Sequence, residues 1–316
     1  MSGASGIAGA PLRLGTRRSK LAMAQSGQVA EAVTRLTGRA VELVEITTQG
    51  DTSRERLSQI GGTGVFVGAL REALLAGEVD FVVHSLKDLP TGAAEGITLV
   101  AIPPRHDPRD ALVARDGLAL AELPAGSRIG TGSPRRAAQL LLLGLGHEIV
   151  PIRGNVDTRI GFVTSGELDA VVLARAGLGR LGRAEEVTET FDPLHMLPAP
   201  GQGALAVECA AHDAALVELL AGLDDSDTRA AVLAERTLLA VLEAGCSAPV
   251  GALCEVAEGE QVTELYLRAV VVNVDGTESV RLSATGTLDE AEKIGRELAT
   301  ELLARGASGL MGERVP

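Results

Sequence analysis

Short apolar strand signals alternate with amphipathic helix signals over the first two thirds of the chain, and this alternation constrains the fold more than any other feature. The first series places strands at 12–14, 41–47 and 81–83 and helices at 19–36 and 66–75. The second places strands at 128–130, 148–152 and 169–173 and helices at 134–143 and 156–164. A helix between successive strands favours parallel pairing. The chain is therefore predicted to form two α/β domains with mainly parallel sheets.

Proline clusters near 103–108 and 198–201 interrupt the alternation, and we interpret each as a crossing between domains. After the second crossing we expect helices at 230–242 and 289–305 and a hairpin of strands 262–273 and 279–285, which together predict a small α+β domain. The predicted division is residues 1–103 with 203–222, residues 108–198, and residues 226–316.

The formal net charge of −13 is unevenly distributed. Residues 1–108 carry eleven cations and eleven acids, whereas residues 198–316 carry eight cations and twenty acids. An acidic chain argues against nucleic acid or an anionic membrane as partner, because both favour a basic surface. No apolar stretch reaches the length of a membrane span. Residues 1–11 lack the pattern of a signal peptide, so we expect a cytoplasmic protein.

Polar loops follow the predicted strands of both series, and all except 84–90 contain glycine. They lie at 15–19, 47–51, 84–90, 130–136 and 153–159. Ligands of open α/β sheets gather at this position, and helix N-termini there attract anions. Because these loops also carry arginines and hydroxyl groups, they predict a cleft for a ligand with several carboxylates or phosphates.

The sequence lacks the motifs typical of nucleotide-cofactor and metal sites. Neither 130–132 nor 61–64 fits the dinucleotide pattern, and no Walker lysine follows them. The five histidines, at 84, 106, 147, 195 and 212, have no metal-ligand spacing. We therefore expect neither a nucleotide cofactor nor a metal.

Two residues could carry chemistry. Asp88 ends an apolar strand beside Lys87, and the residues alone leave open a turn or cap aspartate and a carboxylate held ionised among cations. Cys246 follows a helix in a Gly/Pro-flanked segment typical of an exposed loop. Cys209 and Cys254 lie in apolar runs and are expected to be core residues. Three cysteines predict no disulfide framework.

Eight segments match one known family in order: LGTRRSKLAMAQ (14–25), VHSLKDLPT (83–91), DPRDALV (107–113), IGTGSPRRAAQL (129–140), IRGNVDTRI (152–160), DAVVLARAGLGRLG (169–182), PGQGALAVE (200–208) and AERTLLAVLEAGCSAPVGA (234–252). In these motifs the sequence resembles the porphobilinogen deaminases, also called hydroxymethylbilane synthases. The resemblance implies two domains like type II periplasmic binding proteins, hinged over a cleft, and a small α+β domain that carries a cofactor cysteine.

The resemblance also implies a transferase reaction and a monomeric enzyme. Four porphobilinogens are joined head to tail with loss of ammonia, and hydrolysis releases hydroxymethylbilane. The implied cofactor is a dipyrromethane held by a thioether to Cys246. Asp88 matches the family carboxylate that bonds pyrrole N–H groups, stabilises the cation left by ammonia and handles protons.

The resemblance also implies binding roles for other residues that occupy positions of the family motifs. The implied cofactor-binding residues are Cys246, Lys87, Asp88, Thr131, Ser133, Arg135, Arg136 and Arg159. The implied substrate-binding residues are Arg17, Ser19, Gln25, Arg153, Arg159, Arg180 and Gln202. The sequence departs from the family at Gln59 and Thr63, where lysines are frequent, and at Pro134 and Ala248.

Two other functions remain to be separated from this one. A solute-binding protein of the same architecture explains the arginines but neither Cys246 nor the acidic C-terminal region. A cysteine-nucleophile acyl-transfer enzyme needs a histidine base, and none lies near Cys246 in sequence. If the chain elongates a bound product, we expect the loop 52–64 and the two crossings to move.

Overall fold

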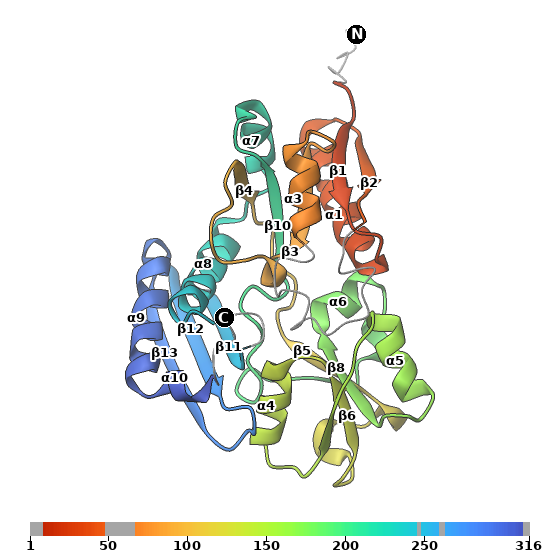
Figure 1. The fold of residues 1–316 in the computed structure, drawn as a ribbon, viewed down its shortest axis with the longest axis vertical. Coiled ribbons are helices and arrows are strands. Elements are labelled where there is room, and N and C mark those ends of the chain that lie inside the picture. Colours follow the sequence, from red (N-terminus) through yellow and green to blue (C-terminus); the bar gives the residue numbers. More distant parts are fainter. Residues whose placement is uncertain (1–8, 48–66, 245–247, 259–262, 312–316) are drawn as a thin grey trace. The chain divides into compact units, whose positions relative to one another are not determined.

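The computed structural model describes residues 9–47, 67–244, 248–258 and 263–311 (Figure 1). The chain divides into two compact units. Unit 1 comprises Met1–Arg105 and Leu205–Ser226, and unit 2 comprises His106–Ala204 and Asp227–Pro316. The three-domain division stays a prediction.

Unit 1 is built on a five-stranded sheet of order β2-β1-β3-β10-β4. Its elements are β1 (Leu12–Thr16), α1 (Lys20–Thr37), β2 (Val41–Glu45), α3 (Gly68–Leu75), β3 (Phe81–Ser85), the 3-10 helix η2 (Leu86–Asp88), β4 (Ile97–Ala101), β10 (Leu205–Ala210) and α7 (Ala214–Ala221). Strand β1 is parallel to β2 and β3, whereas β10 is antiparallel to β3 and β4. Every residue of β10 is buried, as expected for a strand covered on both faces.

The first sheet of unit 2 has the order β7-β6-β8-β5-β9. Its elements are β5 (Asp110–Ala114), β6 (Arg128–Thr131), α4 (Pro134–Leu142), β7 (Glu148–Pro151), α5 (Val156–Thr164), β8 (Ala170–Ala174), α6 (Arg175–Arg180) and β9 (Glu189–Thr190). Strand β6 is parallel to β7 and β8, and β5 is antiparallel to β8 and β9. As in unit 1, one strand of a mainly parallel sheet is reversed.

The second sheet of unit 2 is antiparallel and has the order β11-β12-β13. Its elements are α8 (Ser226–Val241), β11 (Val250–Glu258), β12 (Thr263–Val272), β13 (Ser279–Thr287), α9 (Ala291–Ala304) and α10 (Ala307–Leu310). The hairpin turn after β12 packs on α4, and Gly276 there has a φ of 68°. A Cβ on Gly276 would lie 2.4 Å from Leu141 Cβ, so the contact requires glycine.

The alternation in the sequence predicted most of these elements, and α5 has the predicted bounds 156–164. The predicted helix at 230–242 begins earlier, at Ser226. The reversed direction of β5 and β10 was not predicted, because each strand follows a proline-rich crossing rather than a helix. Helix α6 was also missed, since Gly177 and Gly179 lower its helix propensity.

Candidate active site

The first group of predicted site residues lies at the carboxyl edge of the unit 1 sheet. Strands β1 and β3 are parallel, so the segments that follow them leave the sheet at the same edge. Arg17 and Ser19 follow β1, and Lys87 and Asp88 lie in η2 after β3. The structure therefore brings these two segments to one edge.

Hydrogen bonds order this edge. Buried Gln25 of α1 donates from Nε2 to Ser85 Oγ at 2.8 Å. Ser19 Oγ accepts the N–H of Ala22 and caps α1. Asp88 is partly exposed and ends η2, whose N-cap position is Ser85. Asp88 therefore caps neither η2 nor α1, whereas a role in the turn stays open.

A buried ion network lies farther along the same sheet. Glu208 of β10 accepts hydrogen bonds from Arg71 of α3 at 2.9 and 2.6 Å, and His84 Nε2 lies 3.3 Å from Glu208 Oε2. Burial would raise the pKa of Glu208, but the contacts with Arg71 and His84 outweigh burial and lower it to about 2. In the register Glu208 is opposite Val82, toward the start of β3. Glu208 is thus set back from the edge that carries Asp88, whereas its partner His84 lies one residue before the end of β3.

The second group lies at the carboxyl edge of the first sheet of unit 2. Strands β6, β7 and β8 are parallel, and a segment with predicted site residues follows each. Thr131, Ser133, Arg135 and Arg136 lie at or after the end of β6, Arg153 and Arg159 after β7, and Arg180 after β8. Side chains of Ser133 and Asn155 cap α4 and α5, so both helices begin at this edge.

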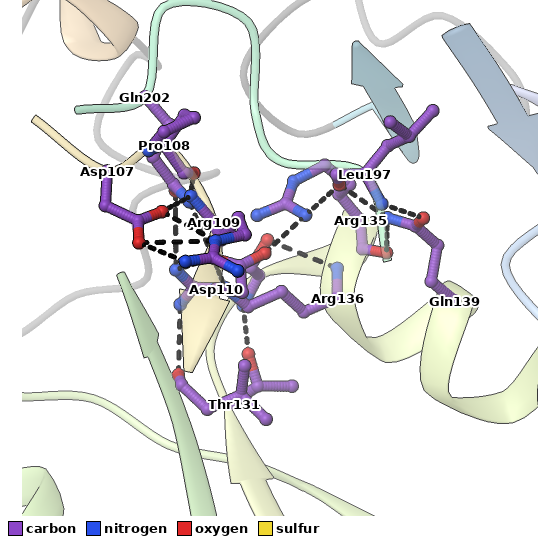
Figure 2. A network of polar contacts seen from close by, with 12 residues as sticks. Asp107, Pro108, Arg109, Asp110, Thr131, Arg135, Arg136, Gln139, Leu197 and Gln202 are labelled. Atoms are coloured by element: carbon purple, nitrogen blue, oxygen red, sulfur yellow. Dashed lines mark hydrogen bonds and ion pairs between the residues drawn. The ribbon is translucent and has the colours of Figure 1, made fainter. Parts of the chain in front are cut away.

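Arg135 and Arg136 converge on Asp110, which no sequence pattern singled out (Figure 2). Asp110 is fully buried at the start of β5, opposite Ala174 at the end of β8. Its Oδ2 accepts from Arg135 Nη1 at 2.8 Å, and its Oδ1 accepts from Arg136 Nε and Nη2 at 3.0 and 2.7 Å. Gln202 Nε2 also donates to Oδ1, at 2.7 Å.

The Asp110 carboxylate is ionised at neutral pH. Burial alone would raise its pKa, but the charges and hydrogen bonds of Arg135 and Arg136 hold the pKa well below its usual range. An acid at the head of the apolar run 111–114 was the sequence signal for such a network, because a buried charge needs compensation. The sequence could not show which cations provide it.

Arg159 and Arg180 have different surroundings from the α4 pair. Burial, joined for Arg159 by the charges of Arg136 and Arg153, lowers the pKa of each to about 10. Their Nε atoms are buried and have no hydrogen-bond partner among the described residues. Arg180 Nη2 does donate to Gly203 O at 2.7 Å. Both side chains stay cationic at neutral pH, so this edge favours an anion.

Some predicted features lie outside the described residues. These include Cys246, residues 48–51 of the predicted polar loop 47–51, and the loop 52–64 with Gln59 and Thr63. Within the described ranges, no group of three or more His, Cys, Asp and Glu residues could hold a metal ion. Nor does any helix in those ranges combine the length and apolar character needed to cross a bilayer.

Cys209 and Cys254 are buried, as expected, and burial raises the pKa of Cys209 to about 11.

Two protein-family models match the chain. "Porphobilinogen deaminase, dipyromethane cofactor binding domain" matches residues 12–218, and "Porphobilinogen deaminase, C-terminal domain" matches residues 229–304. The chain belongs to the porphobilinogen deaminase family. The resemblance drawn from the motifs is thereby confirmed.

Curated relatives match this family member over nearly its whole length. Porphobilinogen deaminase 1 of Streptomyces coelicolor is 66% identical, covering 96% of this chain and 98% of the relative. The porphobilinogen deaminase of Nocardia farcinica is 58% identical, covering 96% and 89%. Among solved structures, an ABC transporter periplasmic substrate-binding protein from Coxiella burnetii aligns with a TM-score of 0.43 and 15% identity, covering 67% of this chain and 91% of that chain.

Proposed function

We propose that this chain is a transferase that condenses four porphobilinogen molecules head to tail, with loss of ammonia, into hydroxymethylbilane. The reaction is primed by a dipyrromethane cofactor on Cys246 and ends with hydrolysis of the product from the enzyme. The curated relatives are named porphobilinogen deaminases, and the matched N-terminal region is named for that cofactor.

The observation that carries this proposal is the buried positive charge at the carboxyl edge of the unit 2 sheet. Porphobilinogen has acetate and propionate side chains, so the cofactor and the growing product are polycarboxylates. Arg159 and Arg180 have buried Nε atoms that find no hydrogen-bond partner in the described part of the chain, and the charged groups that lower the pKa of Arg159 are themselves cations. Ligand carboxylates supply the missing counter-charge. The residues present therefore fit the cofactor.

The role proposed for each residue follows from its position in the family motifs. The groups that hold the cofactor are Lys87, Asp88, Thr131, Ser133, Arg135, Arg136 and Arg159, besides the thioether to Cys246. Those that hold substrate are Arg17, Ser19, Gln25, Arg153, Arg159, Arg180 and Gln202. Two of these side chains are oriented by their neighbours: Gln25 donates to Ser85 Oγ, and Gln202 donates to Asp110 and to Pro108 O.

When bound, the cofactor supplies the pyrrole carbon to which each new unit is joined. Asp88 accepts hydrogen bonds from pyrrole N–H groups and offsets the positive charge that forms when ammonia leaves porphobilinogen. After the new carbon–carbon bond has formed, its carboxylate would take the proton that the joined ring carbon loses, and this loss restores the aromatic ring. Partial exposure lets Asp88 return that proton to solvent.

The same proposal includes a monomeric cytoplasmic enzyme that binds neither nucleic acid nor membrane. The net charge of −13 supports the exclusion of polyanionic partners. The acids are concentrated in residues 198–316, so the arginines of the site do not make the whole surface basic.

Intact-mass spectrometry of the purified full-length chain tests this function. We expect a mass that exceeds the bare chain by two linked pyrrole units, and we expect Cys246→Ser to remove the excess. Turnover of porphobilinogen at the bare chain mass would contradict the covalent primer. A bare chain that binds a carboxylate ligand without turnover would favour the solute-binding alternative.

A further inference from the structure

The Asp110 network joins three segments of unit 2 that are distant in sequence (Figure 2). Pro108 ends the first crossing and Asp110 begins β5, Gln202 directly follows the second crossing, and Arg135 and Arg136 belong to α4. Gln202 Nε2 donates to both Pro108 O and Asp110 Oδ1 at 2.7 Å. One carboxylate therefore holds both crossings against the helix that carries two proposed cofactor ligands.

The charges of this network do not cancel. Burial and the charge of Arg136 lower the pKa of Arg135, whereas Asp110 raises it. The side chains of all three residues are at most 6% exposed, so solvent screens them little. Asp110 neutralises one of the two cations and leaves a net positive charge. The network can thus stay assembled and still attract a ligand carboxylate.

We propose that Asp110 is a positioning residue that assembles the anion site of the cofactor before the cofactor is present. In the cofactor-free chain, Asp110 is the counter-ion that keeps Arg135 and Arg136 together. In the loaded enzyme, cofactor carboxylates share this task. The inference rests on the proposed function, in which both arginines hold the cofactor.

This role differs measurably from that of an ordinary buried ion pair. If the cofactor shares the neutralisation of the arginines, losing Asp110 destabilises the cofactor-free chain more than the loaded one. If the arginines never meet the cofactor, both forms lose the same stability, because the network is then the same in each.

The test compares melting temperatures in two backgrounds of the full-length chain. One is the loaded enzyme, verified by intact mass, and the other carries Cys246→Ser and stays cofactor-free. We expect Asp110→Asn to lower the melting temperature by about 10 °C in the cofactor-free background and by about half as much in the loaded enzyme. Equal losses, or a larger loss in the loaded enzyme, would overturn the proposal.

Arg135→Gln should instead lower the melting temperature more in the loaded enzyme than in the cofactor-free chain. Without this arginine, Asp110 and Arg136 form a balanced pair in the cofactor-free chain, whereas the loaded enzyme also loses a cofactor contact. If Asp110→Asn does not fold, Arg135→Gln decides: an equal loss in both backgrounds would overturn the proposal.

Glu208→Gln is the matched control for removing a buried carboxylate. Glu208 is bonded to Arg71 rather than to a proposed ligand, so equal losses are expected in the two backgrounds. A wild-type chain without added pyrrole mass would contradict the proposed function itself and remove the basis of this inference. Intact mass therefore distinguishes the two failures.

Discussion

Units 1 and 2 each contain a mainly parallel sheet with one reversed strand, and in both the reversed strand begins at the edge where predicted site residues gather. Strand β10 starts with Leu205 opposite Ser85, and β5 starts with Asp110 opposite Ala174. The two units differ in where their buried carboxylate lies. Glu208 of unit 1 lies farther along its strand and pairs with Arg71, whereas Asp110 lies at the edge itself and pairs with predicted ligand residues.

This difference separates two tasks. In unit 1, Arg71 compensates the buried Glu208 within the core, and the proton chemistry proposed for Asp88 does not involve this pair. Unit 2 shares its buried carboxylate with cations that are proposed to hold the ligand, so stability and binding are coupled there. Substitutions at the unit 1 edge should therefore change turnover. At the unit 2 edge, the effect on stability should depend on whether the protein itself or the ligand compensates the substituted cation.

The largest effect is expected for Asp88→Asn. Turnover should fall by about 10³-fold, because the amide neither offsets the developing cation nor accepts its proton. The cofactor mass and the melting temperature should be retained. Steady-state kinetics and intact mass measure this, with exposed Glu95→Gln of unit 1 as control. Near-normal turnover would remove Asp88 from the mechanism.

Arg159→Gln tests how ligand binding and stability are coupled in unit 2. The pKa of Arg159 is about 10 in the fold, below its ordinary 12.5, so the charged form costs stability at neutral pH. Removing it should leave the cofactor-free Cys246→Ser chain as stable as before, or more stable, while kcat/KM of the loaded enzyme falls about 30-fold or more. Arg128→Gln, at the other end of β6, is the control. If the cofactor-free chain also lost stability, a group of the protein rather than the ligand would compensate Arg159, which would contradict this prediction.

Glu208 should control acid stability without controlling turnover. Its pKa is about 2 in the fold against an ordinary 4.5, so its contribution is complete above about pH 4.5 and is lost as pH falls toward 2. Glu208→Gln should cost about 3 kcal/mol at neutral pH and flatten this acid dependence. Urea unfolding at several pH values measures both effects. A large fall in turnover per folded molecule would show that the network and Asp88 are not separate.

The smallest effects concern the helix caps that begin at each edge. Ser19→Ala and Ser133→Ala should each cost about 1 kcal/mol, since each side chain accepts a backbone N–H of its helix. Exposed Ser165→Ala, at the C-cap of α5, should cost less. If Ser133 also holds a carboxylate, its substitution should weaken cofactor retention, measured by intact mass. If Ser133→Ala lowers stability but leaves cofactor retention unchanged, Ser133 acts only as a helix cap.

Local patterns predicted most of the elements and one edge of each mainly parallel sheet. Residues that follow parallel strands must gather at the carboxyl edge, so the grouping of Arg17 with Asp88, and of Arg136 with Arg159, followed from strand order. The reversed strands escaped prediction because β5 and β10 take their direction from crossings. Their apolar residues show burial but carry no information about direction.

By itself, the sequence determined the family, the alternating elements and the residue types that fit a polycarboxylate. Only the tertiary structure decided which arginines are compensated within the protein and which have a buried Nε without a hydrogen-bond partner among the described residues. Asp110 meets Arg135 and Arg136 across 25 and 26 residues and Gln202 across 92, and Glu208 meets Arg71 across 137. The reason is physical: burial makes each charge depend on its neighbours in space, and those neighbours come from strands and helices far apart in the chain.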